Sequence, residues 1–170
     1  MKMIPAFRLL LILSFATALA FTGPGVQAGD PVKLDMPDFN EFEPWLYKET
    51  DSVYVINFWA TWCAPCVKEI PAFEELNARY SSDKVKVLLV SLDFPNQVES
   101  RVLPFMDRLN IQSQVILLDD PYSNRWIGKV SEEWSGAIPA TVIYSSGFRG
   151  FYEREFTFEE LEEIVKPLIK

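Results

Sequence analysis

The fold is decided by residues 53–66, which read VYVINFWATWCAPC. The first seven of these residues are almost all β-branched or aromatic, which is typical of a β-strand buried on both faces. From Cys63 onward, apolar side chains recur every three or four residues, and this spacing predicts a helix over residues 63–80. The residues that set the spacing are Val67, Ile70, Phe73, Leu76 and Tyr80. The two cysteines, three positions apart, therefore lie where a buried strand passes into a helix.

This position gives the two cysteines different predicted roles. Unpaired backbone N–H groups and the helix dipole stabilise a thiolate at the start of a helix, so Cys63 is predicted to be the nucleophile. Cys66 lies one turn further in, where it can attack the mixed disulfide that Cys63 forms with a substrate and so release the product. Pro65 fits the first turn, because its missing N–H has no partner to lose there.

Two other readings of the cysteine pair are a structural disulfide and half of a zinc site. Zinc prefers four ligands, and the chain has no third cysteine and no histidine. A disulfide that closes so short a loop contributes comparatively little stability. The sequence therefore favours redox chemistry at Cys63 and Cys66.

The composition fits one globular domain and excludes several classes of function. Of 170 residues, 49% are hydrophobic and 24% are charged, which supports a core and argues against disorder. The formal net charge of −8 leaves no basic stripe for nucleic acid. The absence of histidine excludes Ser-His-Asp and Cys-His catalysis, histidine-ligated metals and haem attachment through C-x-x-C-H.

The N-terminal residues have the pattern of a secretory signal peptide. Lys2 and Arg8 form a positive n-region, residues 9–21 an apolar h-region, and Val26-Gln27-Ala28 a small-residue cleavage site. We predict a signal peptide over residues 1–28 and a mature globular domain over residues 29–170, exported to the periplasm or another extracytoplasmic space. The alternative is an uncleaved leader that anchors the protein, although its apolar run is shorter than the roughly 20 residues that span a bilayer.

The rest of the chain predicts strands that alternate with helices. Strands are expected over residues 85–92, 115–118, 140–144 and 150–156, the last two forming a hairpin around Ser145-Ser146-Gly147. Helical segments are expected over residues 40–47, 98–109 and 122–130, with Asn40 as the first N-cap, and Pro71 should kink the helix after the cysteines. Thr157 and Glu160 predict a capping box for a final helix. This order predicts an α/β fold with a central mixed β-sheet flanked by helices.

These motifs carry a resemblance to a known family. Residues 59–66, WATWCAPC, resemble the active-site motif of the thioredoxin superfamily, and Pro71 matches the helix-kinking proline of that family. Ile138-Pro139 resembles its cis-proline, which packs against the disulfide and presents backbone to the substrate, and Gly147 fits the hairpin turn that follows. The resemblance covers residues 53–170 and implies a thioredoxin fold with Ile138 and Pro139 in the substrate-binding site.

Within the superfamily, the chain resembles the exported TlpA/ResA-like branch. The leader, the acidic lead-in and the long stretch between Cys66 and Pro139, which matches a central insertion, carry this resemblance. Glu69, three residues after Cys66, matches a glutamate that the branch places near its active site. On the same helix face as Cys66, Glu69 is predicted to be the proton partner of the resolving thiol. The alternative is an ordinary glutamate at the edge of the helix beside Lys68.

The chain departs from related patterns at two places. Asn57 stands where cytoplasmic thioredoxins have a buried aspartate that exchanges protons with the inner cysteine. Ala140-Thr141 replaces the glutamate that cytochrome-maturation members carry after the proline.

The tryptophans have separate predicted roles. Trp62 is expected to be partly exposed, to shield the disulfide and to offer partners an apolar surface. Trp59 is expected in the core, and core or loop packing is assigned to Trp126 and Trp134.

Together these features predict an exported thiol-disulfide oxidoreductase that reduces disulfides of cysteine-containing exported proteins, with no bound cofactor, metal or nucleic acid. Strongly oxidising relatives have a histidine before the second cysteine, and Pro65 here favours a reductase. The resemblance implies a membrane-bound electron donor. The alternatives are a thiol peroxidase and a thioredoxin-fold binding module with little turnover.

Overall fold

The computed structural model describes residues 34–170. The predicted signal peptide, residues 1–28, lies outside the described residues. Within residues 34–170, no helix combines the length and the apolar character needed to cross a bilayer.

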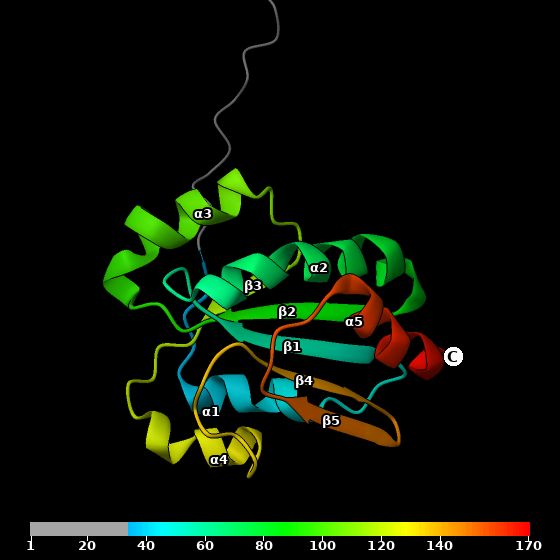
Figure 1. The fold of residues 1–170 in the computed structure, drawn as a ribbon. Helices are drawn as coiled ribbons and strands as arrows, with labels where there is room; N and C mark the ends of the chain where they lie inside the picture. The colour runs from blue at the N-terminus through cyan, green and yellow to red at the C-terminus, as the bar shows by residue number, and fades with distance from the viewer. Residues whose placement is uncertain (1–33) are drawn as a thin grey trace, which may run out of the picture. The chain divides into compact units, whose positions relative to one another are not determined.

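Five strands form one mixed sheet in the order β3-β2-β1-β4-β5 (Figure 1). The strands are β1 (Val53–Trp59), β2 (Val85–Ser91), β3 (Gln114–Leu117), β4 (Ala140–Ser145) and β5 (Phe148–Tyr152). β1 pairs in parallel with β2 and antiparallel with β4, so the strand predicted to be the most buried lies at the centre. The predicted α/β class with a central mixed sheet is confirmed.

Helices cover both faces of the sheet, which explains why all seven residues of β1 are buried and why only Asn57 among them is polar. One face carries α2 (Ala64–Tyr80), α3 (Leu103–Arg108) and α5 (Phe158–Val165), and the other carries α1 (Phe39–Phe42) and α4 (Ile127–Val130) (Figure 1). Alternate residues of a strand point to opposite faces. Val53, Val55 and Trp59 accordingly join the first hydrophobic cluster, while Tyr54, Ile56 and Phe58 join the second.

The helix that begins at the cysteine pair and the C-terminal helix both start where the sequence predicts. Cys63 is the N-cap of α2, and the helix continues through Pro71 to Tyr80. Thr157 and Glu160 form the capping box of α5. Short helical turns supply the remaining connections: η1 (Glu43–Tyr47), η2 (Ser81–Asp83), η3 (Pro95–Gln97), η5 (Ser123–Arg125) and η6 (Lys166–Leu168).

Two helical predictions need correction. Asn40 is not an N-cap: Asp38 caps α1, because it forms a capping box with Glu41 that satisfies backbone N–H groups at both positions. The helix predicted over residues 98–109 is divided into a π-helical turn, η4 (Val98–Val102), and α3. Pro104 explains the division, since it lies in the first turn of α3, where a missing N–H is tolerated.

The predicted hairpin is present, but the bounds predicted for its turn and its returning strand are wrong. Ser145 pairs with Phe148, which leaves a two-residue turn in which Gly147 adopts a φ of +92°. The returning strand β5 therefore begins at Phe148 and ends at Tyr152 rather than running over residues 150–156. Its expected C-terminal part leaves the sheet because the backbone N–H of Phe156 donates to a side chain on α2.

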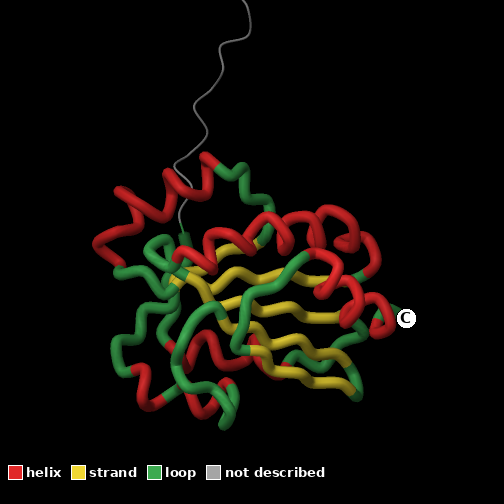
Figure 2. The backbone as a smooth tube through the Cα atoms, viewed as in Figure 1, coloured by secondary structure: helices red, strands yellow, loops and turns green. Residues whose placement is uncertain are grey.

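The topology brings the cysteines to a loop-rich edge of the sheet. The parallel strands β1, β2 and β3 all end at this edge, and β4 begins there because Ala140 pairs with Phe58. Connecting loops crowd this end of the sheet (Figure 2). The residues after β1 and the residues before β4 consequently meet.

Candidate active site

Cys63 and Cys66 form a disulfide at the start of α2. The Cys63 sulfur accepts a hydrogen bond from the backbone N–H of Cys66 at 3.3 Å, as an N-cap acceptor does. Cys63 retains 6% of its surface exposed, whereas Cys66 is fully buried. Cys63 is thus the sulfur on the solvent side, and the helix N-terminus is positioned to stabilise negative charge on it.

The loop before β4 packs against this disulfide. The Ile138–Pro139 peptide bond is cis, as the family resemblance implies. The Ile138 carbonyl oxygen lies 3.7 Å from the Cys63 sulfur. The structure therefore brings Ile138 and Pro139, which are more than 70 residues from the cysteines in sequence, to the disulfide.

A buried carboxylate supports the other loop of the site. Asp93, which follows β2 and is 3% exposed, accepts hydrogen bonds from the Thr61 N–H at 2.9 Å and the Thr61 hydroxyl at 2.5 Å. The Ser91 hydroxyl donates to the same carboxylate at 2.8 Å. Because Thr61 lies two residues before Cys63, these bonds fix the path of the chain that leads to Cys63. Asp93 was not predicted from the sequence, because its partner Thr61 lies 32 residues away along the chain.

Glu69 is buried and not, as the alternative reading had it, at the edge of the helix. It is 1% exposed, and its carboxylate accepts hydrogen bonds from Asn57 Nδ2 at 2.7 Å and from the Phe156 N–H at 2.9 Å. Asn57 Nδ2 also donates to Thr141 Oγ1. Burial raises the pKa of Glu69 to about 7, against the opposing effect of these hydrogen bonds. Asn57, at the position of the thioredoxin aspartate, is thus a direct partner of Glu69.

The tryptophans lie as expected. Trp62 is 56% exposed beside the disulfide, while Trp59 is fully buried in the core. Trp126 and Trp134 are buried against the opposite face of the sheet. The Trp134 indole N–H also donates to the Ala137 carbonyl at 2.8 Å, so this residue both fills the core and holds the loop that leads to Pro139.

A second glutamate near the site was not anticipated from the sequence. Glu153 follows β5, and its carboxylate accepts hydrogen bonds from the N–H groups of Ser135 and Ala137 at 3.1 Å and 3.0 Å and from the Ser135 hydroxyl. These hydrogen bonds, chiefly the one from the Ser135 hydroxyl, hold the pKa of Glu153 below its ordinary value. The predicted hairpin strand over residues 150–156 had included this residue without assigning it a role.

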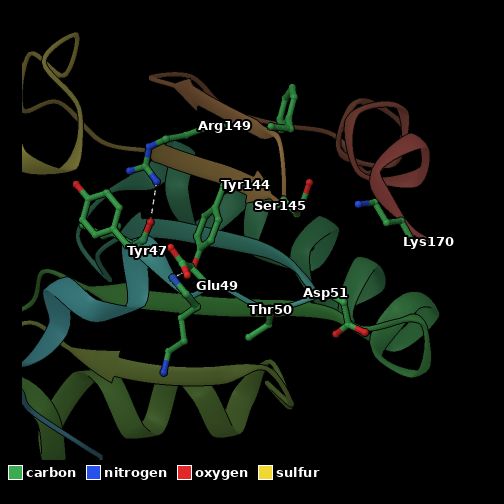
Figure 3. Close-up of a pocket in the computed structure, with 12 residues that line it drawn as sticks. Tyr47, Glu49, Thr50, Asp51, Tyr144, Ser145, Arg149 and Lys170 are labelled. Atoms are coloured by element: carbon green, nitrogen blue, oxygen red, sulfur yellow. Dashed lines mark hydrogen bonds between the residues drawn. The ribbon is translucent and has the colours of Figure 1, made fainter.

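A cavity of about 720 Å³ lies at the other end of the sheet, where β4 turns into β5. Arg149 and Tyr144 point into it, and Arg149 donates to the backbone carbonyl of Leu46 (Figure 3). None of its lining residues belongs to the disulfide or to the loops around it, so this cavity does not mark the redox site. Within residues 34–170, no group of three His, Cys, Asp or Glu side chains is arranged to hold a metal ion.

Comparison with known proteins places these features in a family. The chain is 42% identical over 117 residues to the thiol-disulfide oxidoreductase ResA of Bacillus thuringiensis subsp. konkukian. The matched segment covers 66% of this chain and 61% of that relative. It spans between 20% and 50% of the length of three other curated relatives. The chain therefore matches parts of these relatives rather than their whole length.

Solved structures share the fold. A thioredoxin-family thiol:disulfide interchange protein from Chlorobium tepidum superposes with a TM-score of 0.59 at 21% identity, over 71% of this chain and 81% of that chain. A secreted thiol-disulfide isomerase from Corynebacterium glutamicum superposes with a TM-score of 0.59 at 20% identity, over 70% and 71% of the two chains. The architecture is therefore thioredoxin-like. Residues 25–147, most of the chain, match the model of the AhpC/TSA family, and the chain belongs to that family.

Proposed function

We propose that this protein is an exported thiol-disulfide oxidoreductase that reduces disulfides in other exported proteins. The observation that carries the proposal is the Cys63–Cys66 disulfide at the N-terminus of α2, facing the backbone of Ile138. A helix N-terminus lowers the pKa of a thiol, and partial exposure of Cys63 gives a substrate access to it.

The reaction takes two steps of thiol-disulfide exchange. In the reduced protein, the Cys63 thiolate attacks one sulfur of a substrate disulfide, which forms a mixed disulfide and releases one substrate thiolate. The Cys66 thiol then loses its proton and attacks the Cys63 sulfur. This step forms the Cys63–Cys66 disulfide, releases the second substrate thiolate and completes the transfer of two electrons to the substrate.

Glu69 is suited to take the proton from Cys66. It lies three residues further along α2, on the same buried side of the helix, and its pKa of about 7 lets it exchange a proton near neutral pH. Its hydrogen bond from Asn57 links it to the strand position where cytoplasmic thioredoxins carry an acid. Glu69 can therefore supply the proton exchange that an aspartate at the position of Asn57 supplies in cytoplasmic thioredoxins.

The substrate surface consists of Trp62, Ile138 and Pro139. Trp62 is exposed and apolar, so it can cover a partner segment next to the reacting sulfurs. Ile138 offers backbone beside Cys63. The partners are cysteine-containing exported proteins, and a membrane-bound donor re-reduces the disulfide.

The signal-peptide pattern of residues 1–28 supports export, and one structural neighbour, from C. glutamicum, is a secreted protein. Pro65 supports the reductive direction, because it supplies no charge that would stabilise the Cys63 thiolate in the reduced protein. We expect a midpoint potential nearer the −270 mV of thioredoxin than the roughly −120 mV of DsbA.

Insulin reduction with dithiothreitol as the electron source tests the activity. The protein should accelerate disulfide cleavage, and Cys63→Ser should abolish the acceleration. A protein that shows no turnover would instead be a binding module. Consumption of hydroperoxide in place of disulfide would indicate a peroxidase. Equilibration with glutathione buffers tests the direction. A midpoint more oxidising than about −180 mV, the value of protein disulfide isomerase, would show that the protein donates disulfides.

The partners are found with Cys66→Ser, which retains the nucleophile and cannot resolve mixed disulfides. Proteins trapped by this variant should be cysteine-containing exported proteins released by reducing agent. Cys63→Ser is the matched control, since it differs from the wild type by the same exchange of sulfur for oxygen and lacks the attacking thiolate.

A further inference from the structure

The loop that precedes Pro139 is tied to the end of β5 by a single carboxylate. The Glu153 carboxylate accepts hydrogen bonds from the backbone N–H groups of Ser135 and Ala137 and from the Ser135 hydroxyl. Hydrogen bonds to an ionised acceptor are about twice as strong as neutral ones. Three donors on one carboxylate therefore hold this exposed loop at a fixed place.

The core holds the same loop from its other side. The buried Trp134 donates its indole N–H to the Ala137 carbonyl at 2.8 Å. Between the two anchors, Gly136 adopts a φ of +96°, a conformation that side chains rarely allow, and an added Cβ would lie 3.2 Å from Ile127 Cδ1. The path of the loop is thus fixed by an anion, an indole and a glycine.

Together, the two anchors occupy both polar backbone groups of Ala137. Glu153 takes the Ala137 N–H, and Trp134 takes the Ala137 carbonyl. In the described part of the chain, the Ile138 N–H donates to no protein acceptor, and the nearest polar contact of the Ile138 carbonyl is the Cys63 sulfur. The backbone groups of Ile138, which follows Ala137 and lies beside the Cys63 sulfur, are therefore left for a partner.

We propose that Glu153 is a positioning residue for disulfide exchange: it fixes the Ser135–Ala137 backbone so that the Ile138 backbone is held ready to pair with an extended polypeptide that carries the substrate cysteine. This inference rests on the proposed function. Without Glu153 the loop would have to become ordered when a polypeptide substrate binds. The conformational entropy lost in that ordering would weaken the binding of such substrates.

The location of Glu153 separates this role from a role in folding. Ser135, Gly136 and Ala137 are exposed, so their N–H groups can form hydrogen bonds with water when the carboxylate is removed. The core anchor at Trp134 and the cysteine pair stay in place. Removal of Glu153 should therefore change substrate binding much more than it changes the fold or the reactivity of Cys63.

The test compares kcat and KM for two disulfides, with dithiothreitol as electron source. One substrate is a self-quenched peptide disulfide, and the other is bis(2-hydroxyethyl) disulfide, which has no peptide backbone to pair. Glu153→Ala should raise KM for the peptide about tenfold with kcat nearly unchanged, and should leave the small disulfide unaffected. Glu153→Gln keeps one acceptor oxygen and should lie between the wild type and Glu153→Ala.

Glu133→Gln is the matched control, because Glu133 lies in the same connection before Pro139, is exposed, and has a side chain that makes no hydrogen bond or ion pair with the described residues. It should behave as the wild type does. Hydrogen exchange at the Ala137 amide provides a second readout, since its protection should fall in Glu153→Ala and persist in the control.

A wild-type KM for the peptide in Glu153→Ala, or an equal loss for both disulfides, would overturn the inference while leaving the proposed function intact. If Glu153→Ala does not fold, the intermediate KM expected of Glu153→Gln decides the question. A wild-type protein that reduces neither disulfide would refute the proposed function and this inference with it.

Discussion

The buried carboxylate of Glu69 should make the stability of the protein depend on pH in a specific way. Its pKa rises from an ordinary 4.5 to about 7 in the folded protein, and each unit corresponds to 1.36 kcal/mol. Ionisation of Glu69 therefore costs about 3 kcal/mol more in the folded protein than in the unfolded chain. Since the side chain is 1% exposed, little solvent screening reduces this figure.

The sign follows from which state holds the proton. Below pH 4.5 Glu69 is protonated in both states, and its neutral form contributes fully to stability. Between pH 4.5 and 7 the unfolded chain releases the proton while the folded protein retains it, so the free energy of unfolding falls as the pH rises. Above pH 7 both states are ionised and the loss is complete.

Glu69→Gln removes this titration with little change in shape. The new amide keeps one acceptor oxygen and gains an N–H donor. Asn57 Oδ1, which has no hydrogen-bond partner among the described residues, can accept from that donor if the Asn57 amide turns over. The variant should therefore fold and should lack the dependence on pH.

The assay is urea unfolding of the oxidised protein from pH 4 to pH 8, in which the disulfide keeps the cysteines from titrating. The free energy of unfolding of the wild type, minus that of Glu69→Gln, should fall by about 3 kcal/mol over this range. Glu163→Gln, on the exposed side of α5, should run parallel to the wild type. A constant difference between the wild type and Glu69→Gln would refute the argument that burial raises the pKa of Glu69.

Three further predictions concern the loop that leads from β1 into Cys63. In the reduced protein near neutral pH, iodoacetamide should modify Cys63 well before Cys66, and mass mapping that finds Cys66 modified first would reverse the assigned roles. Thr61→Val removes the hydroxyl that donates to Asp93 and should lower the free energy of unfolding by about 1–3 kcal/mol in urea, where no change would show that this bond does not support the loop. Trp62→Ala should alter stability by less than about 0.5 kcal/mol because the side chain is exposed, yet slow the reduction of insulin; unchanged insulin kinetics would remove Trp62 from the substrate surface.

The sequence was sufficient for those features whose cause is local. The apolar run of β1 reports burial on both faces, and the capping box of Thr157 and Glu160 needs only residues of one helical turn. The disulfide is local as well, since Cys63 and Cys66 are one turn apart. The cis bond before Pro139 was predicted by family resemblance alone, because nothing in its immediate neighbours requires it.

The hydrogen-bond network around the site could not be predicted because its partners are distant in the chain. The Phe156 N–H meets Glu69 across 87 residues, and Asp93 meets Thr61 across 32. The sequence of a polar segment does not show whether a carboxylate in it is solvated or accepts hydrogen bonds from a distant loop. The error in the hairpin has the same origin, since residues after Tyr152 leave the sheet to make contacts that only the tertiary structure provides.

Glu69 and Glu153 are chemically identical, and their surroundings give them opposite properties. Glu69 is cut off from water and receives two hydrogen bonds, so the cost of burial prevails and its pKa rises to about 7. Glu153 remains in contact with water and receives three, so its pKa falls and it stays charged at neutral pH. A group that is half protonated near neutral pH suits proton exchange with Cys66, whereas a permanent anion suits a fixed anchor for backbone N–H groups. Exchange of the two environments, and not of the residues, would exchange the two roles.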